Sequence, residues 1–92
     1  MAYVDEAAIL SGCARGESDA VQAALRAYAP LVLAIARQTL RDPLIIEDAV
    51  HEVFIELWRS AGRFDPGKGS ARTFVSTIAR RRLIDRGRAE QV

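Results

Sequence analysis

The 92-residue sequence has few of the features that mark secreted or membrane proteins. Its one cysteine, Cys13, cannot form an internal disulfide, which suits a reducing compartment. No apolar run approaches the roughly 18 residues needed to span a bilayer, and the N-terminus lacks the basic flank of a signal peptide. We therefore expect a soluble, cytoplasmic chain with no membrane insertion.

Residues suited to catalysis are equally scarce. His51 is the one histidine, and no cysteine lies near it at ligand spacing, so we expect no metal site and no cofactor. No Ser-His-Asp set is available, and the acidic side chains fall on different predicted faces. An enzyme is therefore the least favoured class of function.

No segment has the alternation of a strand, whereas helical spacing recurs along the chain. Residues 5–14 predict a short helix closed by Gly16, and Ser18 can cap a second segment. Because proline removes a backbone donor, Pro30 should break that segment near Ala29 and begin a new helix. The predicted core positions of the two segments are Val21, Leu25, Tyr28, Leu31, Val32, Ile35, Ala36 and Leu40.

Two longer helices follow. An Asp-Pro pair at positions 42–43 predicts a helix that runs to about Ser60, and Ser70 can cap a last helix that fades after Gly87. Between them, the glycine-rich residues 62–69 predict a loop. The fold class is therefore predicted as all-α, a compact bundle of four to five helices in one domain. The core positions expected here are Ile46, Val50, Val53, Phe54, Leu57, Phe74, Ile78 and Leu83.

The net charge of +1 conceals an asymmetry along the chain. Residues 1–62 carry five arginines against nine carboxylates, a net charge of −4. Residues 63–92 carry eight basic side chains against three acidic ones, a net charge of +5. A basic end suits a polyanion, and an acidic body suits a cationic surface or another protein.

The basic end begins with the run RFDPGKGSAR at positions 63–72, whose glycine-rich centre could hold a phosphate. A nucleotide-binding P-loop has the form GxxxxGK[ST] and follows a buried strand. Here Lys68 is followed by Gly69 instead of a hydroxyl residue, and a helical pattern precedes the loop. We therefore exclude the NTPase class.

Two polar surfaces remain once the core is assigned. On the helix after position 42, Asp48, Glu52 and Ile55 lie at i, i+4 and i+7 with His51 adjacent. These four residues form what we call the acidic strip, which is predicted on the face away from the core. The last helix presents hydroxyl and guanidinium groups that can contact phosphates, sugars or bases, at Arg72, Thr73, Ser76, Thr77, Arg80 and Arg81.

The runs EDAVHEVFIELWR, RFDPGKGS and ARTFVSTIARRRLIDRGR occur in that order along the chain. Together they resemble region 2 of the extracytoplasmic-function (ECF) sigma factors of bacterial RNA polymerase. The family pattern is approximately DxxQEVFxxxW, a short loop that begins with Phe, and a helix of the form [FW]LxxIAxNxxIDxxR. The resemblance covers the chain from about Ser18 onward.

The resemblance implies a partner for each surface. The acidic strip, Asp48, His51, Glu52 and Ile55, would dock on the clamp helices of the largest subunit of core RNA polymerase. The basic end would bind the non-template single strand of the promoter minus-ten element, capture a flipped base in the loop and so help to melt the promoter. The residues implied for DNA binding are Phe64, Asp65, Lys68, Gly69, Ser70, Arg72, Thr73, Phe74, Thr77, Arg80 and Arg81.

The resemblance also implies a layout. Residues 1–17 would be an N-terminal extension with a short helix, 18–60 the core and polymerase-binding helices, 61–70 the base-capture loop and 70–88 the promoter-recognition helix. We expect no counterpart of the family's second helical domain, region 4, which binds the minus-thirty-five element. An anti-sigma factor is a further implied partner.

Two positions depart from the family pattern. His51 stands where the family usually has Gln. This replacement preserves a side chain that can form a hydrogen bond. Arg81 stands where many members have Asn, so a cation suited to phosphate replaces an amide that can read a base edge. The identity of the captured base therefore does not carry over from the family.

The main alternative is a stand-alone helical protein-interaction module, bound by a regulator such as an anti-sigma factor. Phe64 and Phe74 also fit plain core aromatics, and the arginines at 80–82 fit a solvated helix end favoured by the helix dipole. Asp48 and Glu52 also fit an ordinary solvent-facing pair. These structural interpretations stay open at the level of sequence.

Overall fold

The computed structural model describes the backbone of residues 3–91 and the side chains as far as residue 88. Within that range the chain forms four helices, two short 3-10 turns and no strand. The helices are α1 (Glu6–Ala14), α2 (Ser18–Thr39), α3 (Pro43–Ser60) and α4 (Ala71–Gln91), and the turns η1 (Ala61–Arg63) and η2 (Pro66–Lys68) join α3 to α4. The prediction of an all-α bundle is confirmed.

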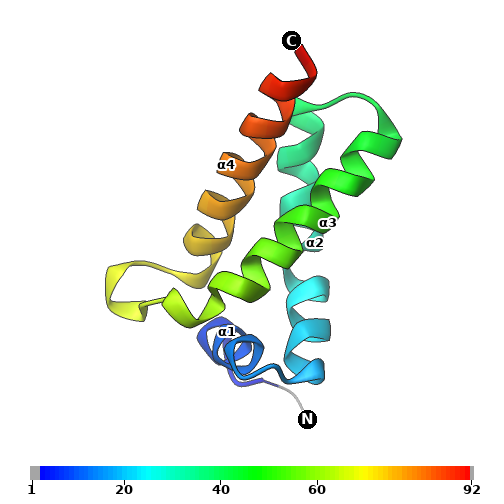
Figure 1. The fold of residues 1–92 in the computed structure, drawn as a ribbon. Coiled ribbons are helices and arrows are strands. Elements are labelled where there is room, and N and C mark those ends of the chain that lie inside the picture. Colours follow the sequence, from blue (N-terminus) through cyan, green and yellow to red (C-terminus); the bar gives the residue numbers. More distant parts are fainter. Residues whose placement is uncertain (1–2, 92) are drawn as a thin grey trace.

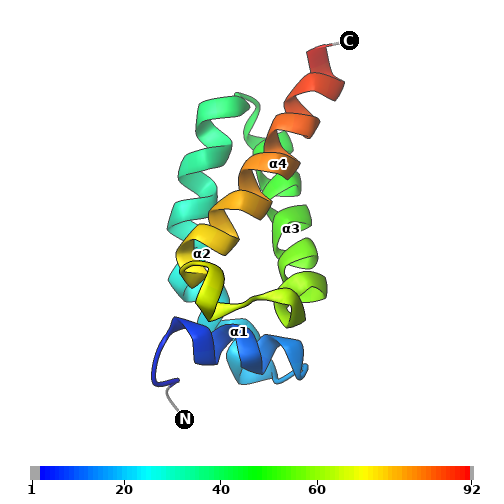
Figure 2. The same cartoon turned by 90° about the vertical axis from the view of Figure 1, so that its left-hand side faces the viewer.

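Helices α2, α3 and α4 run alongside one another, and α1 lies across one end of them (Figures 1 and 2). The η1–η2 loop, yellow-green in Figure 1, lies at the same end as α1, and α1 packs against η1. The C-terminal end of α4 lies at the opposite end of the bundle. Helix α1 therefore packs against the start of the loop that carries the glycine-rich run.

Three helix starts follow local capping chemistry. The Asp5 Oδ1 atom accepts a hydrogen bond from Ala8 N at 2.8 Å, and Asp42 Oδ1 accepts one from Leu44 N at 2.9 Å. Ser70 Oγ accepts one from Thr73 N at 3.1 Å, which confirms it as the cap of α4. The prediction that Ser18 caps α2 is wrong, because Ser18 is already helical and Glu17, at the cap position, makes no side-chain capping bond.

The predicted helix break at Pro30 is also wrong, since α2 continues through this proline from Ser18 to Thr39. Pro30 is exposed, so the carbonyl that loses its hydrogen bond can be solvated. Tyr28 and Val32, on either side of it, are fully buried. Tertiary packing of the buried face therefore holds together a helix that local propensity would divide.

The predicted end of the last helix after Gly87 is wrong, because α4 continues to Gln91. Gly87 is buried against the end of α2, and a Cβ built on it would lie 3.0 Å from Thr39 Cγ2. The glycine therefore serves close helix packing here and does not end the helix.

The core lies between all four helices and consists mainly of small and aliphatic side chains. Leu25, predicted in the core, is 36% exposed, and Val21, Leu31, Ile46, Val50 and Phe74 are only partly buried against the core. Ala49 and Ser60 on α3 are buried although the spacing analysis did not select them. The largest fully buried side chains are Tyr28, Leu10, Leu57, Leu83, Val32, Val53 and Val75.

Helix α2 is long and apolar enough to cross a membrane by length and composition alone, with a hydropathy of 1.2. The prediction that no stretch approaches that length is therefore wrong by this measure. The core helix of a water-soluble bundle passes the same test, and α2 packs against α1, α3 and α4. Of the apolar stretch of α2, 33% is buried inside the bundle.

Candidate functional site

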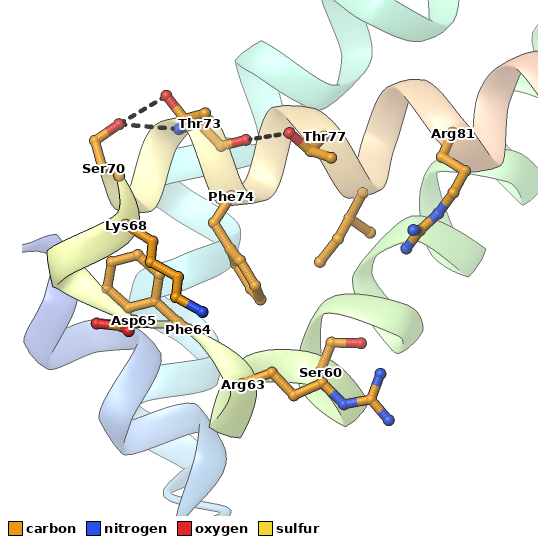
Figure 3. A pocket seen from close by; sticks show the side chains of 12 residues that line it. Ser60, Arg63, Phe64, Asp65, Lys68, Ser70, Thr73, Phe74, Thr77 and Arg81 are labelled. Carbon is orange, nitrogen blue, oxygen red and sulfur yellow. Dashed lines mark hydrogen bonds between the residues drawn. The ribbon is translucent and has the colours of Figure 1, made fainter.

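A cavity of about 390 Å³ opens between the end of α3, the η1–η2 loop and the first turns of α4 (Figure 3). Nine of the eleven residues predicted to bind DNA line it, and the two that do not are Arg72 and Arg80. Ser60, Arg63 and Ile78 line it too, although sequence analysis assigned none of them to DNA binding. The nine are Phe64, Asp65, Lys68, Gly69, Ser70, Thr73, Phe74, Thr77 and Arg81.

Two aromatic rings form the apolar part of this cavity. The ring centroids of Phe64 and Phe74 lie 5.4 Å apart with an interplanar angle of 60°, an edge-to-face pair. Figure 3 shows Phe74 pointing from α4 toward the loop that carries Phe64. Both side chains are partly buried against the core, so the core interpretation and the cavity interpretation hold together.

The loop has a defined backbone. Asp65 Oδ1 accepts a hydrogen bond from Gly67 N at 2.9 Å, and Asp65 O accepts one from Lys68 N at 3.0 Å, which closes η2. Gly69 then has φ +156° and ψ 178°, a conformation that side-chain-bearing residues rarely adopt. Gly69 thus forms an extended link, at a φ that glycine adopts readily, between the loop and the capped start of α4.

The hydroxyl groups of Ser70 and Thr77, which line the cavity, form hydrogen bonds with Thr73. Ser70 Oγ donates to Thr73 Oγ1 at 3.0 Å, and Thr77 Oγ1 donates to the Thr73 carbonyl oxygen at 2.9 Å. By contrast, Arg63, Lys68 and Arg81 are exposed and make no hydrogen bond or ion pair with the described residues. The cavity therefore offers aromatic surface and three available cations to a ligand.

Arg72 and Arg80 are exposed on α4 outside the cavity. They add positive charge to the same helix that contributes Thr73, Thr77 and Arg81 to the lining. A ligand with one group in the cavity and an extended anionic backbone could meet these cations along α4. Arg63 was not predicted as a binding residue. It begins the RFDPGKGS run, so its charge next to Phe64 could have identified it from the sequence.

The acidic strip lies on α3, with Asp48 and His51 exposed and Glu52 and Ile55 partly buried. Its carboxylates are not free. Arg86 Nη2 donates to Asp48 Oδ2 and Arg86 Nη1 donates to Glu52 Oε1, each at 3.0 Å. Asp48 and Glu52 therefore lie outside the core, but α4 contacts both through Arg86, a contact that sequence analysis did not predict.

Polar contacts between α3 and α4 continue toward the cavity. Arg82 Nη2 lies 4.0 Å from Glu56 Oε1, and Ser60 Oγ donates to Glu56 Oε2 at 2.7 Å. The Ser60 hydrogen bond, with nearby arginines, lowers the pKa of Glu56 below its ordinary value. We call this set the α3–α4 seam, made of Asp48, Glu52, Glu56, Ser60, Arg82 and Arg86.

No group of three or more potential metal ligands gathers among the described residues. Comparison with known protein families matches residues 24–92 to sigma-70 region 2. The chain belongs to the sigma-70 region 2 family. The matched residues include most of α2 and all of α3, the loop and α4, so the cavity and the acidic strip both lie within region 2.

Several relatives carry the name ECF RNA polymerase sigma factor SigK. The one from Mycobacterium ulcerans is 38% identical over 84 residues, which are 91% of this chain and 45% of the relative. The one from Mycolicibacterium vanbaalenii is 34% identical over 91% of this chain and 43% of the relative. The one from Mycobacterium bovis is 42% identical over 60 residues, 65% of this chain and 32% of the relative.

These matches confirm the predicted resemblance to the region 2 domain of an ECF sigma factor. The chain spans less than half the length of the curated relatives it matches. Comparison with solved structures finds no significant match.

Proposed function

We propose that this region 2 domain acts in transcription initiation as part of an RNA polymerase sigma factor. It binds core RNA polymerase and the non-template single strand of a promoter minus-ten element, and it holds one flipped base in the cavity. The observation that carries the proposal is the convergence of nine residues, from a loop and a helix, on one cavity with aromatic and cationic walls. The role requires the cytoplasm, where polymerase and promoter meet.

Single-stranded nucleic acid binds where cations follow its backbone and aromatic side chains receive its bases. In this domain Phe64 and Phe74 supply the aromatic surface, while Arg72 and Arg80 supply charge along α4. Stacking contributes about 1–3 kcal/mol per base, which offsets part of the cost of unpairing. A cavity for one base therefore favours the melted state of the promoter without any covalent step.

The polymerase contact is proposed for the acidic strip, on the same bundle. Of its four residues, the side chains of His51 and Ile55 make no hydrogen bond or ion pair with the described part of the chain, and Ile55 is partly exposed. A polar ring and an aliphatic side chain on one helix face suit a helix-on-helix contact with the clamp helices of the largest subunit. A regulator of the anti-sigma type would act by covering this surface or the cavity.

The experiment is a fluorescence-anisotropy titration with single-stranded oligonucleotides at several salt concentrations. Lys68→Ala and Arg80→Ala should each weaken binding by about threefold to tenfold and lower the slope against salt by about one ion, because each removes one phosphate contact. Arg26→Ala is the matched control, since Arg26 is an exposed arginine on α2 whose side chain makes no hydrogen bond or ion pair with the described residues. It should leave the affinity nearly unchanged.

Base capture is tested in the same titration by changing one base of the oligonucleotide at a time. A large loss of affinity at one or two positions supports the flipped-base pocket and identifies its preferred base. Salt-sensitive binding with no base preference would contradict base capture and leave only a basic surface. Absence of binding by wild type would instead favour the protein-interaction module, with a regulator as the ligand.

A further inference from the structure

Arg86 is a residue of α4 whose side chain reaches across to α3. Its two terminal nitrogens donate to Glu52 Oε1 and Asp48 Oδ2, each at 3.0 Å. Because these carboxylates are four residues apart, one guanidinium spans a full turn of α3. The Arg86 side chain is only 26% exposed, so salt screens this contact less than it screens an ordinary surface pair.

Few apolar side chains are buried among the described residues of the C-terminal part of α4. Beyond Leu83, the one buried position in the described part of α4 is Gly87, which has no side chain to bury. Ile84 is 44% exposed. Apolar packing, which scales with the area removed from water, is therefore weak in this stretch. The polar contacts of the α3–α4 seam therefore contribute relatively more to holding α4 on the bundle.

The seam also leads toward the cavity. Arg82, one turn before Arg86, lies beside Glu56, and Glu56 accepts the hydrogen bond of Ser60. Ser60 lines the cavity, as does Arg81, the neighbour of Arg82. The contacts that hold α4 on α3 therefore continue to the wall of the candidate base pocket.

We propose that Arg86 is a positioning residue: through Asp48 and Glu52 it holds the C-terminal half of α4 on α3 and so sets the direction of the nucleic-acid-binding face. The effect on nucleic acid rests on the proposed function, whereas the effect on α4 does not. The two carboxylates thus serve α4 as well as any partner of the acidic strip. Reversing their charge would disturb α4 too, so it cannot by itself test polymerase docking.

Amide hydrogen exchange on the whole chain tests the contact without a ligand. In Arg86→Ala, the amides of residues 82–88 should exchange about threefold faster or more than in wild type. Asp48→Asn with Glu52→Gln should also speed exchange, and combining all three changes should have less than the summed effect, because both variants remove the ion pairs of Arg86 with these carboxylates. Arg88→Ala, a matched loss of an exposed arginine, should leave these amides unchanged. Unchanged exchange in Arg86→Ala would overturn the proposal.

Oligonucleotide affinity tests the positioning role. Arg86→Ala should weaken binding about threefold more than Arg88→Ala, and Arg86→Lys should recover only part of the loss, because an ammonium lacks the fork that spans two carboxylates. Neutralising Asp48 and Glu52 makes the chain more positive, so charge alone would tighten binding, whereas a misplaced α4 weakens it.

Full recovery by lysine, equal losses at positions 86 and 88, or tighter binding by the neutralised pair would each overturn the positioning role. If wild type bound no oligonucleotide, the proposed function would fail and the positioning role with it. The exchange experiment would still decide whether Arg86 holds α4, so the two failures are distinguishable.

Discussion

At the scale of single residues, several side chains that line the cavity already form hydrogen bonds with neighbouring residues. Asp65 shapes the loop by accepting from Gly67 N, and Ser70 caps α4 while donating to Thr73. These residues therefore shape the pocket more than they are free to read a base. The available donors are the cations Arg63 and Lys68, with Arg81 on the facing helix.

Gly69 gives the sharpest residue-scale prediction. With φ at +156°, a side chain strains the backbone even though a Cβ would meet nothing within 4 Å. Gly69→Ala should therefore lower the free energy of unfolding by about 1–3 kcal/mol and weaken oligonucleotide binding, because the loop must change conformation. Urea denaturation and anisotropy measure the two effects.

The control is Gly62→Ala, in the same loop. Gly62 has no positive φ, and its Cβ would meet Ala14 Cβ at an ordinary 3.8 Å. We expect a change within about 0.5 kcal/mol there. Equal stability and equal binding for both variants would show that the conformation of Gly69 is not required.

At the scale of elements, α2 combines an unfavourable residue with a favourable face. Pro30 removes a backbone hydrogen bond in mid-helix, yet Tyr28, Val32 and Ile35 pack the opposite face into the core. Burial of a large aliphatic side chain contributes about 1.5–3 kcal/mol, so the buried face outweighs the proline. The helix is therefore held by its neighbours more than by its own propensity.

Pro30→Ala should raise the free energy of unfolding by about 1–2 kcal/mol, since alanine restores the hydrogen bond and loses only the entropy advantage of proline in the unfolded chain. Thermal or urea unfolding measures the gain. Pro43→Ala is the matched control, because Pro43 occupies the first position of α3, where a backbone donor is not needed. A gain at Pro43 as large as at Pro30 would refute this account.

At the scale of the whole molecule, one bundle carries two proposed surfaces. The cavity lies near the end covered by α1, and the acidic strip follows α3 away from it. Helices α3 and α4 connect the two, through the core and through the seam. Variants that leave the seam intact are therefore needed to separate polymerase binding from nucleic-acid binding.

The double variant His51→Ala with Ile55→Ala meets that condition. Neither residue belongs to the seam, and Ile55 is not among the residues of the core cluster. Binding to core RNA polymerase should weaken about fivefold or more, because truncated side chains at the centre of an interface cost over 1 kcal/mol. Oligonucleotide affinity and urea stability should stay at wild-type values. Unchanged polymerase binding would remove the acidic strip from the proposed interface.

Much of this protein follows from its sequence alone. The caps at Asp42 and Ser70, the loop between α3 and α4, and the inward positions Val53, Leu57 and Ile78 all follow from local rules. These rules concern spacings of two to four residues, which the chain satisfies wherever it folds as a helix. The family pattern is local in the same sense, because it consists of short linked blocks.

Only the tertiary structure decided the rest. The continuity of α2 through Pro30 and the burial of Gly87 depend on neighbouring helices, which a local rule does not include. The contact of Arg86 with Asp48 joins residues 38 positions apart, and no spacing rule along one helix predicts it. Contacts between segments are determined by how helices pack, because packing alone brings distant side chains within hydrogen-bonding distance.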